Sequence, residues 1–261
     1  MIDGGFALAG AVTGLVVGIT GVGGGSLMTP ILLLVFGIAP HTAIATDLWF
    51  AAITKIVALP FHRHQGKVDW QVARRLWIGS IPISIVVVAM IAAGGSIGKL
   101  EWLSRAIGAV VLLTAVGLVL APWLQGLARS RRISKPDRFK RHQAAWTVVA
   151  GVLLGVLVSM TSVGAGALGT VLLLVLYPLR MTPHRLVATD IAHAIPLVLV
   201  AGVGYLFAGM VDGVMLLSLL CGSVPAVICG SVLARYFSPR WLQVVLAVVL
   251  AAVAVKTLGV G

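Results

Sequence analysis

The sequence predicts an all-α polytopic membrane protein made of two inverted repeats, each with a glycine-broken pair of short helices and three full spans. Three observations lead to this prediction: the apolar composition, an internal repeat, and a change in the side on which basic loops lie. Of the 261 residues, 60% are hydrophobic and 10% are charged, whereas a soluble domain carries about 25% charged residues. A water-exposed surface cannot be built from this composition, so the useful unit is the membrane span of roughly 20 apolar residues.

The apolar segments form two sets of five. In the first half they cover residues 6–20, 26–37, 42–61, 71–93 and 100–123, and in the second half 146–160, 167–179, 186–207, 214–234 and 241–258. The first two segments of each half are short and meet at a glycine-rich break, and the other three are long enough to span. We therefore expect a first membrane repeat at 1–123, a basic cytoplasmic linker at 124–145 and a second repeat at 146–261.

The two halves share their polar residues and glycines in order. When Gly14 is aligned with Gly155 the two breaks coincide, and after a two-residue insertion Ala45-Thr46-Asp47 coincides with Ala188-Thr189-Asp190. Further matches are Pro40 with Pro183, His41 with His184, Asp69 with Asp212, Gly79 with Gly222, Ser80 with Ser223 and Pro82 with Pro225. Chance produces matches of Leu and Val in an apolar chain, but not these ordered polar matches. We infer a structural repeat.

The basic residues indicate how each half is oriented. Most of the 19 Lys and Arg residues lie in or beside four stretches, at 63–75, 129–141, 180–185 and 235–240. The positive-inside rule places these stretches in the cytoplasm. The basic loop of one half corresponds in the repeat to an uncharged loop of the other, so the halves are expected to be inverted, with both termini outside. The net charge of +12 is then explained by topology, and no nucleic-acid partner is expected.

The two glycine-rich breaks are the predicted binding site. Short, glycine-interrupted segments at matched positions indicate a transporter site, because irregular backbone at membrane depth is tolerated only inside protein or beside a water-filled cavity. The helix after each break offers free amides and a partial positive charge, which suits a small anion. The alternative is close helix packing through small residues. The residues expected to bind the anion are Thr20, Gly23, Gly24, Gly25, Ser26, Thr161, Ser162, Gly164, Ala165 and Gly166.

Thr46-Asp47 and Thr189-Asp190 are the second candidate group. A carboxylate within a span is rare and indicates function. Asp190 and His193 share a helix face, so they are able to pair and carry a proton. The alternative is a structural role, in which each Asp bonds the neighbouring break. The duplication of the Asp in both halves fits this alternative. The sequence does not decide whether these residues carry an ion or proton or have a structural role.

Lys55 lies eight residues after Asp47 on a similar helix face. It is expected either to balance Asp47 or to hold the anion, and the alternative is that it reaches the nearby inner surface. The second half has Val198 at the corresponding position. Lys55 therefore has no counterpart in the second half. This is expected of a substrate-binding residue when only one half contacts the charged group of the substrate.

Several motifs together resemble the TauE/SafE sulfite exporter family of anion permeases. They are the Gly21–Gly25 break followed by Pro30, Pro40, the Ala-x-x-Thr-Asp stretches ending at Asp47 and Asp190, and the Gly-Ser-x-Pro pairs. Many members have Gly where this chain has Ala45 and Ala188, and Ala165 stands where the first break has Gly24. The resemblance covers nearly the whole chain and implies two repeats and transport of sulfite, sulfonates and related small organic anions.

The expected function is that of a secondary transporter of small anions, with sulfite or organosulfonates as substrates. It would work by alternating access in a bacterial inner membrane. The partners expected are the anion and the bilayer, and the sequence also permits a homodimer. A membrane-embedded enzyme and a non-transporting scaffold are the alternatives. No nucleophile–base pair or metal cluster occurs at matched depth, so we expect no enzymatic activity, metal or cofactor.

The predicted orientation is testable by cysteine labelling in a variant that lacks Cys221 and Cys229. A cysteine placed at Ile2 should react with a membrane-impermeant maleimide in intact cells, since the N-terminus is expected outside. A cysteine at Ser134 should react only after the membrane is opened. Labelling of Ile2→Cys from the cytoplasmic side alone would contradict the orientation.

Overall fold

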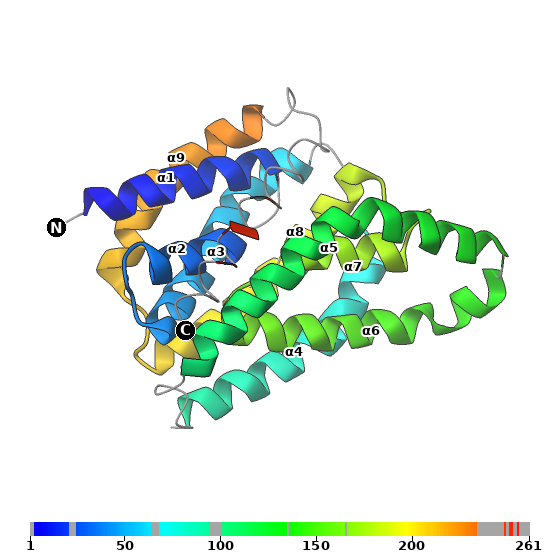
Figure 1. Ribbon diagram of the computed structural model, residues 1–261, viewed down its shortest axis with the longest axis horizontal. Coiled ribbons are helices and arrows are strands. Elements are labelled where there is room, and N and C mark those ends of the chain that lie inside the picture. Colours follow the sequence, from blue (N-terminus) through cyan, green and yellow to red (C-terminus); the bar gives the residue numbers. More distant parts are fainter. Residues whose placement is uncertain are drawn as a thin grey trace.

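The computed structural model describes residues 3–20, 25–63, 68–93, 101–134, 136–164, 166–233, 248, 251, 252 and 255. These residues form helices joined by short turns, with no strand among them, which confirms the all-helical prediction. The helices, shown in Figure 1, are α1 (Gly4–Thr20), α2 (Gly25–Leu34), α3 (Pro40–Arg63), α4 (Trp70–Ala92), α5 (Glu101–Ser134), α6 (Pro136–Thr161), α7 (Ala167–Leu176), α8 (Pro183–Phe207) and α9 (Gly213–Leu233).

Five of the described helices are long and apolar enough to cross a membrane. The spans are Pro40–Pro60, Trp70–Ala92, His142–Thr161, Arg185–Phe207 and Gly213–Leu233. The sequence predicted a short segment at 146–160, but α6 begins ten residues earlier at Pro136, so this segment is long enough to span. The predicted last segment, 241–258, lies mostly outside the described residues.

The stretch predicted as a linker, 124–145, is helical almost throughout. The helix α5 continues to Ser134, and Pro136 starts α6, where its fixed φ and missing N–H suit a first helical position. The two helices extend together beyond the rest of the bundle (Figure 1). The basic residues here are compatible with helix because Arg, Lys, Ala and Gln are good helix formers. The assignment of this stretch to the cytoplasm stays a prediction.

The two halves exchange helices. The first helix of each half packs along the fourth helix of the other half: α1 along α9, and α6 along α4 (Figure 1). Backbones touch at glycines in both pairs. A Cβ at Gly14 would lie 2.6 Å from the carbonyl oxygen of Ser223, and a Cβ at Gly155 would lie 2.5 Å from that of Ser80. Since each residue is the repeat equivalent of its counterpart, the two interfaces are the same contact made twice, as a two-fold relation produces.

A second pair of exchanged contacts lies at the starts of the long helices. The backbone N–H of Asp212 donates to the Thr46 hydroxyl at 3.2 Å, and the N–H of Asp69 donates to the Thr189 hydroxyl at 2.9 Å. Again the residues are repeat equivalents. The predicted structural alternative for Thr46 and Thr189 therefore has a concrete form, because each threonine holds the start of a helix from the other half.

Equivalent helices at the centre run in opposite directions. Trp49 near the start of α3 donates to the Gly202 carbonyl near the end of α8, at 2.9 Å, while Lys55 further along α3 meets Asp190 near the start of α8. The buried core includes side chains from both helices, among them Leu48, Ala52, Leu197 and Val198. The contact between the halves thus includes two antiparallel copies of the same helix, in addition to the larger α1–α9 and α4–α6 interfaces.

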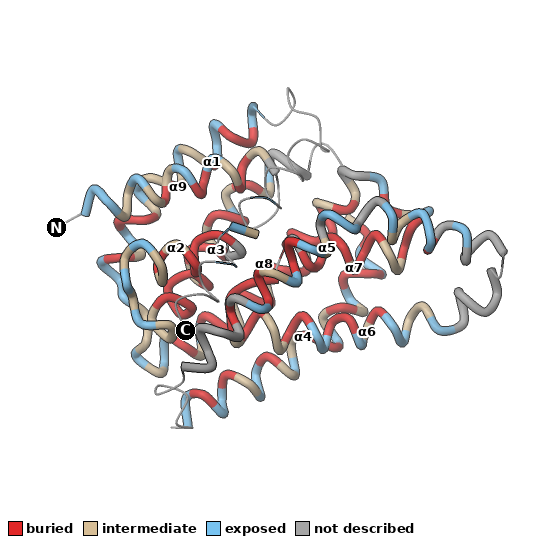
Figure 2. The backbone as a smooth tube through the Cα atoms, in the orientation of Figure 1, coloured by how far each residue is buried: buried red, intermediate tan, exposed pale blue. Residues whose placement is uncertain are grey.

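Apolar and polar side chains are arranged as in a membrane protein. Large apolar side chains face outward; Phe207 is 88% exposed and Leu8 is 68% exposed. Figure 2 shows exposed residues along the outer faces of the helices and buried residues where helices meet. Conversely, Asp47, Lys55, Asp190 and His193 are buried. An apolar exterior around polar groups suits a lipid environment, because an unpaired polar group in hydrocarbon is costly.

We predict that the glycine contacts are required for stability. Gly14→Val and Gly155→Val should each destabilise the protein, by about 1–3 kcal/mol if neighbours shift to accommodate the new side chain. Gly126→Val is the control, since nothing lies within 4 Å of a Cβ at Gly126. Thermal unfolding in detergent measures the effect. Equal midpoints for all three variants would contradict the close backbone approach.

Candidate functional site

The break between α6 and α7 has irregular backbone. After Thr161 the chain passes through Ser162 with φ 57°, Gly164 with φ 114° and Gly166 with φ 155°. Glycine adopts such angles without a Cβ clash, whereas Ser162 is strained there. The equivalent position in the first half is Gly21, so a serine has been placed where the backbone prefers glycine. A strained residue at such a place is a candidate for a functional role.

Two groups that the sequence predicted as anion donors are used within this break. The Thr161 hydroxyl donates to the Leu157 carbonyl at 2.7 Å and accepts from the Val163 N–H at 3.1 Å. The Gly166 N–H donates to the Gly164 carbonyl at 2.7 Å. The Thr161 hydroxyl and the Gly166 amide therefore hold the break together, whereas the Ser162 hydroxyl is not used within the break.

The first break is described only at its edges. Gly23 and Gly24, and also Ala165 of the second break, lie outside the described residues. Thr20 ends α1, and Gly25 and Ser26 begin α2, while the side chains of Thr20 and Ser26 are outside the description. The roles predicted for these residues stay predictions.

Asp47 links the first half to the second break. Its carboxylate accepts a short hydrogen bond from the Thr29 hydroxyl of α2, and the Ser162 hydroxyl lies beside the same carboxylate. Asp47 Oδ1 and Ser162 Oγ are buried and make no hydrogen bond of normal geometry with the described residues. Part of the predicted structural role is thus visible, since Asp47 fixes the helix after its own break. The unused oxygens leave capacity for a ligand or water.

Lys55 pairs with Asp190 of the other half rather than with Asp47, so the expectation that it balances Asp47 is corrected. Its Nζ lies 3.9 Å from Asp190 Oδ2, and the two side chains are 1% and 2% exposed. Neither Lys55 Nζ nor Asp190 Oδ2 has a hydrogen-bond partner among the described residues. The physical reason is the antiparallel packing of α3 on α8, which brings the end of one beside the start of the other.

His193 contacts a residue of the first half instead of Asp190. Its Nε2 lies 3.0 Å from Ser80 Oγ on α4, and its carbonyl accepts from the Trp77 indole at 3.1 Å. The spacing of Asp190 and His193 placed them on one helix face but not in contact. His193 is near enough to Lys55 to feel its charge, so Lys55, Asp190 and His193 belong to one buried polar region.

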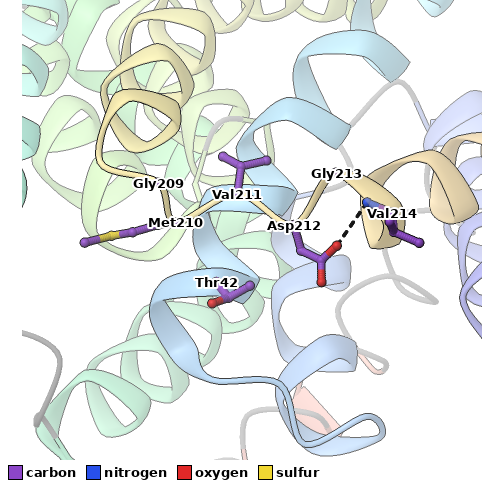
Figure 3. A pocket seen from close by; sticks show the side chains of 7 residues that line it. All are labelled: Thr42, Gly209, Met210, Val211, Asp212, Gly213 and Val214. Carbon is purple, nitrogen blue, oxygen red and sulfur yellow. Dashed lines mark hydrogen bonds between the residues drawn. The ribbon is translucent and has the colours of Figure 1, made fainter.

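The repeat-equivalent ends of α4 and α9 differ. Asp69 caps α4 and is held by Arg180, whose Nη2 donates to Oδ1 at 2.8 Å, and by Arg185, whose Nη2 lies 3.0 Å from Oδ2. Its equivalent, Asp212, caps α9 and is exposed. Thr42, the equivalent of Arg185, lies across a cavity of about 520 Å³ from it (Figure 3). Among the described residues, ion pairs hold Asp69 at one end, whereas Asp212 at the other end makes none and borders this shallow, open depression.

Sequence reasoning did not select Asp69, Arg180, Thr29 or Ser80 as site residues. Asp69 and Ser80 stood out as repeat matches, and Arg180 as an inner-loop charge, but nothing indicated that they meet. Thr29 repeats as Thr170, and that match was the available signal. Among the described residues no group of three His, Cys, Asp or Glu side chains is arranged to hold a metal.

Comparison with known proteins agrees with the membrane architecture. The family described as "Sulfite exporter TauE/SafE" matches residues 6–257. A relative from Bacillus subtilis (strain 168), "Probable membrane transporter protein YjnA", is 35% identical over 246 residues, covering 92% of this chain and 93% of the relative. Another from the same organism, "Probable membrane transporter protein YdhB", is 25% identical over 240 residues, covering 89% of each chain. No solved structure matches the chain.

We predict that Thr29 anchors Asp47. Thr29→Val removes the donor and leaves a buried carboxylate with one fewer hydrogen bond, which should lower stability by about 1–3 kcal/mol. Thr29→Ser keeps the hydroxyl and should stay close to the parent. The unfolding midpoint in detergent separates these outcomes. A loss of stability in Thr29→Ser with none in Thr29→Val would show that the methyl group, and not the hydrogen bond, matters.

Proposed function

This chain belongs to the TauE/SafE sulfite exporter family, and we propose that it is a secondary transporter of small anions, with sulfite and organosulfonates as the substrate class. The observation that carries the proposal is the buried ammonium of Lys55, which donates no hydrogen bond to any described residue. An ammonium taken out of water requires an anionic partner and several acceptors. Asp190, at 3.9 Å, supplies the charge but no direct hydrogen bond.

The second break supplies a further donor in the same interior. Ser162 Oγ is buried and makes no normal hydrogen bond with the described residues, and its backbone occupies a position that favours glycine. The backbone strain at Ser162 is explained if its hydroxyl contacts a ligand. Lys55, Ser162 and the break amides together would offer charge and hydrogen bonds to an oxyanion, which selects for charge and size more than for identity.

The exchanged contacts support inverted repeats. Equivalent helices α3 and α8 run antiparallel, and each half contributes the same contacts to the other. If both helices cross the bilayer, the halves are related by an axis in the membrane plane. With the basic loops in the cytoplasm, both termini then lie on the outer side of the membrane. Inverted halves place a substrate between them near the midplane and allow alternate opening by movement of one half against the other.

The unequal ends support alternating access. The ion pairs of Asp69 with Arg180 and Arg185 would close the cytoplasmic end, since the basic loops are expected inside. The equivalent cavity beside Asp212 and Thr42 would open on the outer face. In that case the structure represents a state with its outer end more open than its inner end.

The alternative functions have weaker support. An enzyme would require a metal cluster or a nucleophile–base pair that a substrate can reach. The described residues contain one serine–histidine contact, between Ser80 and His193, and both side chains are buried where α4 meets α8. A scaffold would not need a buried, incompletely paired lysine. The relatives are named as membrane transporters, which favours transport.

The proposal predicts flux of radiolabelled sulfite and of isethionate, a permanently anionic organosulfonate, into proteoliposomes that contain the purified protein. Ser162→Gly should fold normally, because glycine suits the backbone, but it should weaken apparent affinity roughly ten-fold or more through loss of one hydrogen bond to a charged ligand. Cys229→Ala, at an exposed position, is the control. Absence of flux in the parent for every small oxyanion tried would contradict anion transport.

A further inference from the structure

The Lys55–Asp190 ion pair is absent from the other half of the repeat. The equivalent of Asp190 is Asp47, which accepts a hydrogen bond from Thr29, and the equivalent of Lys55 is Val198. The pair is therefore not part of the shared architecture of the two halves. Buried ion pairs contribute little to stability in comparison with apolar residues of similar volume, so stability does not explain why this pair is present.

The pair has an open geometry. The 3.9 Å separation is an ion pair without a direct hydrogen bond, and both atoms are buried without another partner among the described residues. On α7, a Cβ at Gly169 would collide with the Asp190 carboxylate, so the carboxylate lies against bare backbone. The ammonium is thus able to exchange one anionic partner for another without a large movement of either helix.

The charges that face Asp190 are few. Lys55 faces it from α3, and His193 of its own helix α8 bonds Ser80 of α4. At the start of α4, Asp69 lies beside Thr189, and its carboxylate pairs with two cations, Arg180 and Arg185, so it adds no negative charge near Asp190. From α7, Gly169 lies against the Asp190 carboxylate and carries no charge. With Asp190 ionised, the Lys55 pair is neutral.

A bound anion changes this balance. If a monovalent anion joined the pair, one ammonium would face two negative charges in a water-poor interior, which is unfavourable. The excess is removed if the Asp190 carboxylate takes up one proton from the aqueous side that is open and becomes a neutral carboxylic acid. No bond to the anion forms or breaks. When the anion leaves, the acid releases its proton on that side and the carboxylate returns to Lys55.

We propose that Asp190 couples transport to protons: the substrate anion replaces the Asp190 carboxylate as partner of Lys55, and one proton moves with each anion. This inference rests on the proposed anion transport and adds its coupling ion. Movement of a monovalent anion is then electroneutral. In this scheme Asp190 does not contact the substrate. It acts by giving up its ion pair with Lys55 when the anion binds and re-forming that pair when the anion leaves.

The test uses proteoliposomes with a trapped pH-sensitive dye and an inward gradient of isethionate, which remains ionised at working pH, so that proton movement reports the protein and not a protonated substrate. The parent should acidify the lumen with one proton per anion, and an imposed potassium–valinomycin potential should not change the flux. A flux that follows the potential and moves no proton would overturn the proposal, and this result needs no variant.

Variants locate the proton. Asp190→Asn should retain exchange of labelled for unlabelled isethionate but lose proton movement. Asp47→Asn, the repeat equivalent, should keep the ratio of one proton per anion even if its rate falls. His193→Gln should also keep that ratio. Persistent one-to-one proton movement in Asp190→Asn, or its loss in His193→Gln alone, would overturn the assignment.

Failure of the coupling and failure of the proposed function give different results. If the parent moves neither isethionate nor sulfite, anion transport itself is wrong. If it moves the anion without protons, transport stands and the role of Asp190 is wrong. Should Asp190→Asn not fold, the double variant Lys55→Met with Asp190→Asn removes both charges; it should be monodisperse, bind no anion and move no proton. Proton-coupled flux through this double variant would also overturn the proposal.

Discussion

The close backbone contact between helices of opposite halves is the constraint on which the structure depends. In a bilayer, helices gain little from burying apolar surface against each other, and they associate through small residues that let backbones touch. Glycines of α1 meet α9, and the equivalent glycines of α6 meet α4. The first helix of each half packs against the other half, which forms two matching interfaces. Between these interfaces lie the short helices α2 and α7 and the long helices α3 and α8.

This arrangement explains why polar groups collect inside. The exchanged helices carry exposed apolar side chains such as Leu8, Ile78 and Val214, and Figure 2 shows exposed residues along their outer faces. The centre is left to α3, α8 and the break. Shared features of the halves, such as Thr46 with Thr189 and Asp69 with Asp212, hold helix starts in place. Transport in one direction requires residues that differ between the halves. Three such differences are Lys55 against Val198, Ser162 against Gly21, and Arg185 against Thr42. Each difference adds a charge or a hydroxyl to one half only.

Much of the fold followed from local patterns. Apolar length and glycine-rich breaks predicted most of the described helices within about three residues, because a bilayer restricts the chain to helices of defined length. The end of α5 and the start of α6 were the exceptions. The helical character of 124–145 was missed because charge pattern reports location rather than backbone conformation. The partner of Lys55 was also missed. Sequence spacing along α3 suggested Asp47, whereas Asp190 is brought near only by the antiparallel packing of two distant helices. Likewise, the hydroxyl of Thr161 looked free in sequence, but the local turn uses it.

In the proposed transport cycle the two halves move against each other around a site between them, and the two ends open alternately. Distances between pairs of spin labels by pulsed electron resonance test it directly, in a protein without native cysteines. One pair at Thr42 and Val214 reports the end with the cavity, and one at Arg74 and Leu179 reports the end held by Asp69. Addition of isethionate should shorten one distance while the other lengthens. Changes of the same sign at both ends, or substrate binding that leaves both distances unchanged, would contradict the account.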